Sequence, residues 1–203
     1  MRFFMLSLRS PFSLLVAAML TSITPGALGA GGYQIGERLP SANAPTPPTA
    51  DYREIGWDAL LPADWDPMKA FKKLDLSKLK DSDPKAMEAM DQLKAAWNTA
   101  PVEPKMNGVR VRIPGFIVSL DTNLDRVKEF LLVPYFGACI HVPPPPANQM
   151  IHVFPKKPLR NAQIMGAVWV SGTLETTFSH TDFGEVGYRM KADGVEPYKE
   201  KGR

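Results

Sequence analysis

The chain has 203 residues and a mass of 22.4 kDa, with 44% hydrophobic residues, 22% charged residues and a formal net charge of +3. This hydrophobic fraction is typical of a folded protein and excludes a wholly disordered chain. So small a net charge argues against sustained binding of nucleic acid. Twenty prolines argue against an all-helical fold. The single cysteine excludes an internal disulfide framework and any site built from four thiolates.

The N-terminus has the order of a secretory signal peptide. Basic residues begin the chain, residues 13–23 (SLLVAAMLTSI) are apolar, and small residues follow. The apolar stretch is too short to span a bilayer comfortably, although an uncleaved membrane anchor is the alternative. We therefore expect residues 1–30 to be removed near Gly29 or Ala30, leaving an exported protein that is not stably inserted in the membrane.

The mature chain is expected to begin with irregular segments. Residues 31–50 include the proline-rich stretch SANAPTPPTA, which predicts a flexible leader. Residues 51–105 are expected to form an arm and short helices that dock on the rest of the protein. Because an exported arm that exposed three large apolar groups would aggregate, we expect Trp57, Leu60 and Leu61 to be buried.

Two short helices are predicted in this part of the chain. Each begins with a capping aspartate followed by proline at the first helical position, at Asp66-Pro67 and Asp83-Pro84. Apolar residues then recur at helical spacing, as Met68, Phe71 and Leu74 in the first helix and as Met87, Met90, Leu93 and Trp97 in the second. We interpret both apolar faces as packing surfaces.

Residues 106–198 are predicted to form a mainly β domain, with α+β character only at its margins. Alternating or continuous apolar runs predict five strands, at 109–120 with a bend at Pro114-Gly115, 128–135, 150–154, 167–177 and 187–195. Strands of this number and length suit a small OB-like five-stranded Greek-key barrel, whereas an immunoglobulin-like sandwich would need about seven. Residues 199–203 form a basic tail.

Cys139 and His141 form the candidate chemical site. They are two residues apart, so both side chains would point to one face of an extended chain. A thiolate and an imidazole together suit zinc or copper, and His152 on the next predicted strand is the best candidate for a third ligand. A reactive thiol and a purely structural role for Cys139 are the alternatives.

A run of prolines follows the candidate site. It is expected to form a stiff rod of about 12 Å that walls a binding site or presents a docking ridge. Two amide side chains come next, where the chain returns to the sheet. The predicted binding residues are Pro143, Pro144, Pro145, Pro146, Asn148 and Gln149.

Residues 52–198 resemble a family of exported bacterial proteins of unknown function. The resemblance rests on WDALLP at 57–62, PGFIV at 114–118, FLLVPYFGACIHVPPPPANQ at 130–149 and GYRM at 187–190. It implies a periplasmic factor, often encoded beside an ABC transporter of the lipoprotein-release type. The family's motif carries over onto Cys139, His141, the four prolines, Asn148 and Gln149.

These observations predict a periplasmic binding or accessory protein, associated with an ABC transporter and holding a transition metal through Cys139 and His141. One alternative is a thiol- or metal-dependent enzyme centred on Cys139. The other is a structural adaptor that docks on a protein through the proline run. A cluster of Cys139, His141 and another histidine would favour the metal site, whereas Cys139 packed among apolar side chains would favour the adaptor.

Overall fold

The structure is a computed structural model that describes residues 32–39, 51–66, 84–121, 123, 126–160 and 166–198. The predicted signal peptide, the first predicted helix and the basic tail lie outside these residues. Within them, no helix is both long enough and apolar enough to cross a membrane.

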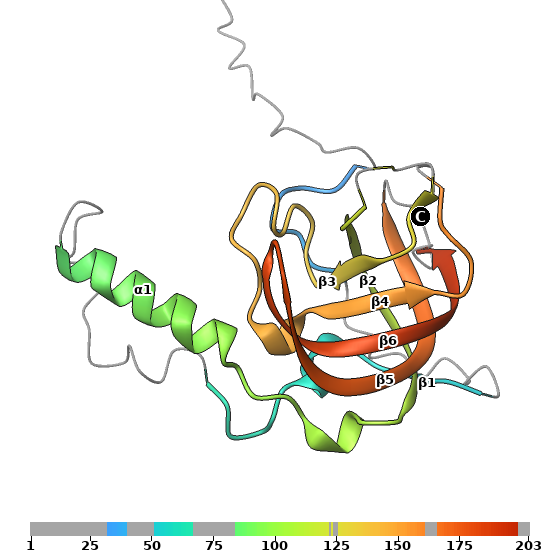
Figure 1. Cartoon of the computed structure of the whole chain (residues 1–203), viewed down its shortest axis with the longest axis horizontal. Helices are drawn as coiled ribbons and strands as arrows, with labels where there is room; N and C mark the ends of the chain where they lie inside the picture. Colours follow the sequence, from blue (N-terminus) through green and yellow to red (C-terminus); the bar gives the residue numbers. More distant parts are fainter. Residues whose placement is uncertain are drawn as a thin grey trace, which may run out of the picture.

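A closed barrel of five strands forms the body of the molecule (Figure 1). Its strands are β2 (Arg110–Ser119), β3 (Phe130–Val133), β4 (Ile151–Pro155), β5 (Ala167–Thr181) and β6 (Gly184–Pro197). Neighbours follow the order β2-β3-β4-β6-β5, and β5 pairs with β2 to close the barrel. The pairs are antiparallel except for β4 and β6, which run parallel. The predicted small, mainly β barrel is therefore confirmed.

Short elements surround the barrel. The two-residue strand β1 (Arg53–Glu54) pairs in parallel with the start of β2. Helix α1 (Pro84–Asn98) begins at the predicted proline, projects to one side and meets the barrel near its C-terminal end (Figure 1). The described residues also include the 3-10 helices η1 (Trp57–Leu60), η4 (Pro104–Met106) and η6 (Ala147–Gln149).

Strand β2 contributes to two hydrophobic cores. Val111 and Ile113 belong to the cluster inside the barrel, whereas Phe116 and Val118 belong to a second cluster on the outer face of the sheet. This second cluster, called the outer core here, also contains Leu131, Val133, Ala138, Met150, Ala167 and Val186. The sequence predicts a bulge or bend at Pro114-Gly115, because these two residues interrupt the apolar alternation. In the structure Arg110–Phe116 pairs with β5 without a register shift, and the buried residues change from one face of β2 to the other near Pro114.

Trp57 accommodates the proline within this strand. Its indole Nε1 donates a hydrogen bond to the carbonyl oxygen of Pro114 at 2.7 Å. The N–H and C=O of one strand residue point to the same side. The nitrogen of Pro114, which lacks a hydrogen, therefore faces away from β5, so the hydrogen-bond ladder between β2 and β5 loses no bond. Trp57 and Leu60 are buried, as predicted, while Leu61 is half-buried.

The hydroxyl of Tyr188 connects the arm and the chain after α1 to the barrel. It donates to the carbonyl oxygen of Leu60 at 2.8 Å and accepts the backbone N–H of Glu103 at 2.6 Å. The Tyr188 side chain is fully buried on β6, and this burial raises its pKa to about 12. The phenol therefore stays protonated at neutral pH and keeps its donor role.

Removing this hydroxyl should destabilise the fold. In Tyr188→Phe the ring is kept, but the Leu60 carbonyl and the Glu103 amide lose their partner, so we expect the free energy of unfolding in urea to fall by about 1–3 kcal/mol. Tyr52→Phe, which removes an exposed hydroxyl, is the matched control and should cost less than about 1 kcal/mol. Equal stability of Tyr188→Phe and the unaltered chain would contradict the role assigned to Tyr188.

Removing the Trp57 ring should be more costly. The ring is 9% exposed, so Trp57→Ala should cost about 3–5 kcal/mol through the cavity it leaves. For a domain of this size that loss lowers the melting temperature by about 6–20 °C, which differential scanning calorimetry measures. Trp65→Ala, which removes a half-buried ring, should give a smaller shift. A shift of equal size in both variants would show that Trp57 does not anchor the arm.

Candidate functional site

The segment that contains the cysteine forms a compact turn, residues 137–142. The carbonyl oxygen of Gly137 accepts the backbone N–H groups of Ile140, His141 and Val142 at 3.3, 2.8 and 3.2 Å. Cys139 has a φ of +66°, whereas no other non-glycine residue that the structure describes has a positive φ. This conformation costs an ordinary L-residue about 1–2 kcal/mol. The extended backbone on which a shared face for Cys139 and His141 was predicted is thus replaced by a turn.

The three predicted metal ligands lie in different environments. Cys139 is partly buried against the outer core, and His141 is exposed. His152 lies on β4 with its Nε2 2.9 Å from Oε2 of Glu129, and its ring stacks on Phe154 with centroids 4.3 Å apart. Within the described ranges, no group of three or more His, Cys, Asp or Glu side chains is placed to hold a metal ion. The zinc or copper site stays a prediction.

Burial raises the pKa of the Cys139 thiol from 9.0 to about 11. At pH 7 the ionised fraction is then about one in 10,000, compared with about one in 100 at the ordinary value. Because the thiolate is the nucleophile, this environment disfavours a reactive thiol. It suits a cysteine that packs as a small apolar side chain.

This environment predicts slow alkylation of Cys139. In the folded protein, iodoacetamide should react at pH 8 at least about tenfold more slowly than in the urea-unfolded chain, because fewer thiols are ionised. The rate, followed by mass spectrometry, should rise with pH towards a midpoint of about 11. A midpoint below pH 8 would contradict the buried thiol and support the alternative of a thiol-dependent enzyme.

The proline run leads from the turn back to the barrel. Pro143 is exposed, whereas Pro145 is buried. The Tyr135 hydroxyl donates to the carbonyl oxygen of Pro143 at 3.1 Å, and the backbone N–H of Gln149 donates to that of Pro146 at 2.7 Å. Both ends of the run therefore make hydrogen bonds, and the end nearer the turn is the more exposed one.

Asn148 and Gln149, predicted to bind a ligand, are buried at the end of this run. Nδ2 of Asn148 donates to the carbonyl oxygen of Pro101 at 2.9 Å. Nε2 of Gln149 donates to the carbonyl oxygen of Trp57 at 3.0 Å. Both amides therefore hold distant parts of the chain together in this structure.

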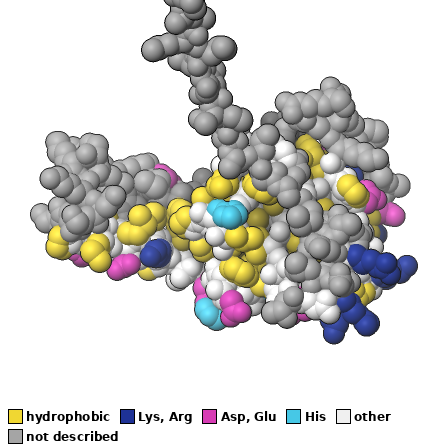
Figure 2. All heavy atoms as spheres, turned by 90° about the horizontal axis from the view of Figure 1, so that it is seen from above, with side chains coloured by type: hydrophobic (Ala, Val, Ile, Leu, Met, Phe, Trp, Pro, Cys, Tyr) yellow, Lys and Arg dark blue, Asp and Glu magenta, His cyan; other side chains and the backbone are white. Residues whose placement is uncertain are grey.

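An apolar hollow of about 160 Å³ lies beside the turn. It is lined by Phe116, Ile117, Val118, Val133, Phe136, Gly137, Ala138, Ile140, His141 and Gly166. On the face seen in Figure 2, hydrophobic side chains gather around a histidine. Pockets for separate small molecules usually measure about 300–1,000 Å³. This hollow therefore better fits one or two side chains of a docked segment.

Residues 32–39, called the N-terminal segment here, cover the adjoining part of the outer core. The Gly36 N–H donates to the carbonyl oxygen of Phe136 at 2.8 Å, and the Phe136 N–H donates to that of Glu37 at 2.9 Å. The Tyr33 ring lies edge-on to Phe116, with centroids 5.1 Å apart, and 6.1 Å from the ring of Phe136.

Sequence reasoning assigned this segment to the leader and missed its contacts. The signal that could have found it is the concentration of Tyr33, Ile35 and Leu39 within a few residues, ahead of the proline-rich stretch. The proline-rich residues 40–50 lie outside the described part of the chain.

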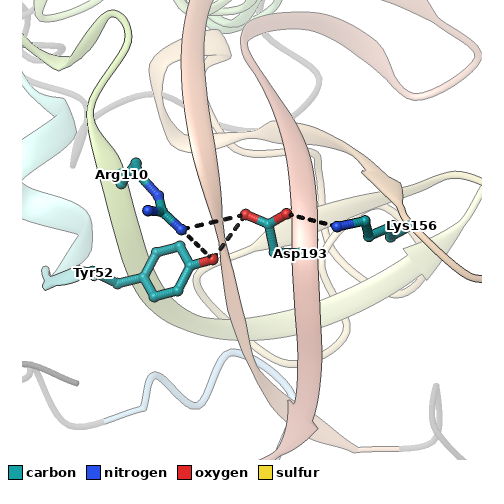
Figure 3. Close-up of polar contacts among 4 residues, drawn as sticks. All are labelled: Tyr52, Arg110, Lys156 and Asp193. Atoms are coloured by element: carbon teal, nitrogen blue, oxygen red, sulfur yellow. Dashed lines mark hydrogen bonds and ion pairs between the residues drawn. The ribbon is translucent and has the colours of Figure 1, made fainter. Parts of the chain in front are cut away.

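A polar cluster joins Tyr52 of the arm to side chains of β2 and β6 (Figure 3). The Tyr52 hydroxyl donates to Oδ2 of Asp193 at 2.8 Å, and Nη2 of Arg110 donates to the Tyr52 oxygen at 2.8 Å. This second bond raises the pKa of Arg110. Nζ of Lys156 lies 3.7 Å from Oδ1 of Asp193. Because these groups are satisfied by one another, we interpret the cluster as an attachment of the arm.

Comparison with known proteins supplies relatives for this structure. A family model described as protein of unknown function (DUF3299) matches residues 57–197. A crystal structure of a DUF3299 family protein from Pseudomonas aeruginosa is 34% identical to this chain and superimposes with a TM-score of 0.56. The match covers 74% of this chain and 99% of that one. No curated protein matches this chain.

Proposed function

We propose that this chain, which belongs to the DUF3299 family of proteins of unknown function, is an exported binding protein that docks a segment of a partner protein beside the turn. The observation that carries the proposal is the apolar hollow with Ile140 at its margin, where 65% of that side chain is exposed. Periplasmic location and association with an ABC transporter are parts of the same proposal. The predicted signal peptide and the sequence resemblance support them.

The exposed apolar groups favour association. Ile140 and Ile35, which is 49% exposed, both lie next to Gly137. Fully burying an exposed aliphatic side chain yields about 1.5–3 kcal/mol, and about 1–2 kcal/mol of this remains available to a partner that covers either residue. The bonds to the Gly137 carbonyl hold Ile140 in place before binding, so little conformational freedom is lost when a partner docks.

Binding is better supported than thiol or metal chemistry. The pKa of Cys139 is raised, which keeps its thiol protonated at neutral pH. His152 already contacts Glu129, and no group of three or more His, Cys, Asp or Glu side chains within the described ranges is placed to hold a metal ion. Packing of Cys139 against the outer core is the observation that we expect for an adaptor.

Site-specific photocrosslinking in living cells tests this function. A benzophenone amino acid replaces Ile140 in the full chain, and the same amino acid replaces Phe178 as a matched control on an exposed apolar side chain. We expect one periplasmic product to form at position 140, to be absent at position 178, and to contain a component of an ABC transporter when identified by mass spectrometry. When the benzophenone amino acid is placed at Ile35 instead, we expect it to crosslink the same partner. Adding Ile140→Asp to that variant should abolish the crosslink.

Three outcomes would each contradict a part of the proposal. Products of equal yield at positions 140 and 178 would show that the surface beside the turn is not a specific docking site. Recovery of the uncleaved chain in the cytoplasm would remove the export part of the proposal. Products without a transporter component would remove that partner class and keep the docking site.

A further inference from the structure

We infer that the N-terminal segment is a displaceable ligand that the chain supplies to its own docking site, and that a partner protein binds by inserting a segment of the same chemistry. That chemistry is an aromatic residue, two variable residues, a turn glycine, one variable residue and a cation, as in Tyr33-x-x-Gly36-x-Arg38. This inference rests on the proposed docking function and names the kind of segment that the site takes.

The N-terminal segment has the geometry of a bound turn. The Glu37 N–H donates to the carbonyl oxygen of Gln34 at 2.9 Å, which closes a four-residue turn. Gly36 occupies its third position with a φ of +83°, as a type II turn requires. The same glycine presents its N–H to the carbonyl oxygen of Phe136. A side chain at this position would strain the turn, which explains why glycine belongs to the recognised pattern.

Two side chains anchor the turn on the barrel. The Tyr33 ring packs against both Phe116 and Phe136, the former in the edge-on arrangement that aromatic pairs prefer. The guanidinium of Arg38 lies over the ring of Tyr135, with its Cζ 5.4 Å from the centroid. Arg38 also forms an antiparallel bridge with Tyr135. Tyr33 and Arg38 therefore each contact specific aromatic rings of the barrel domain.

The N-terminal segment and the hollow share one continuous surface. Phe116 and Phe136 contact Tyr33 and also line the hollow beside the turn. Ile35 lies close to Gly137, the residue whose carbonyl organises the turn. A partner that enters the hollow therefore meets the N-terminal segment directly, and it gains the receptor groups by taking the place of that segment.

The attachment of the N-terminal segment is local, unlike that of the barrel strands. Its main-chain pairing with the barrel is made with the two neighbouring residues Tyr135 and Phe136, whereas β5 and β6 pair over most of their lengths. Segments with few contacts open at a lower free energy than the core does. Displacement of residues 32–39 can thus occur while the barrel remains folded.

A peptide titration tests the inference. The labelled peptide GYQIGERL, residues 32–39, is titrated into the full mature chain and into the double variant Tyr33→Ala/Gly36→Val, with fluorescence anisotropy as the readout. We expect the double variant to bind the peptide at least tenfold more tightly, because its own segment no longer competes. Phe178→Ala removes an exposed ring elsewhere and should bind like the unaltered chain. The peptide GAQIGERL should not bind.

Hydrogen exchange supplies a second measurement that needs no variant. Saturating GYQIGERL should accelerate amide exchange within residues 32–39 of the unaltered chain and leave the exchange of β3 and β4 unchanged. The inference is overturned by equal affinities of the unaltered chain and the folded double variant, by absence of binding to the folded double variant, or by unchanged exchange in residues 32–39.

These results separate the inference from the proposed function. Peptide binding without a crosslink at position 140 would support displacement of residues 32–39 and contradict the docking of a partner protein. A specific crosslink at position 140 without peptide binding would keep the docking function and overturn the displacement by residues 32–39.

Discussion

The hydroxyl of Tyr188 is the point on which the arrangement around the barrel depends. From a fully buried position on β6 it binds the carbonyl oxygen of Leu60 in the arm and the N–H of Glu103 after α1. Because both partners are main-chain groups, they would be left without hydrogen bonds if the hydroxyl were lost. The arm held in this way brings Trp57 within reach of Pro114, so that a central strand tolerates proline.

The same attachment extends to the candidate site. The carbonyl oxygen of Trp57 accepts a bond from Gln149, at the end of the proline run, and the Tyr135 hydroxyl holds the beginning of that run. The turn thus lies next to a proline run that is fixed at both ends. This arrangement presents Ile140 to solvent on a rigid base, which lowers the entropic cost of covering it.

The two hydrophobic cores differ in how they are covered. The cluster inside the barrel draws on strands β2 to β6 and is closed by their pairing, whereas the outer core is covered by the turn and by the N-terminal segment. Cover made of loops carries fewer main-chain bonds than a strand ladder, so it opens more readily. This difference is the reason that we place the proposed docking site on the outer face, with the barrel as its support.

The sequence by itself determined the barrel strands, the start of α1 at Pro84 and the burial of Trp57, because apolar periodicity, capping residues and large apolar side chains act locally. Local bonds to the Gly137 carbonyl form the turn that contains Cys139 and His141, but only the tertiary structure decided that Cys139 packs against the outer core. It also decided that the amide of Gln149 bonds a residue 92 positions away. Likewise, residues 32–39 form main-chain hydrogen bonds with Phe136, about 100 positions further along the chain. Contacts between residues so far apart in the sequence depend on how the barrel closes, and the local apolar periodicity does not predict them.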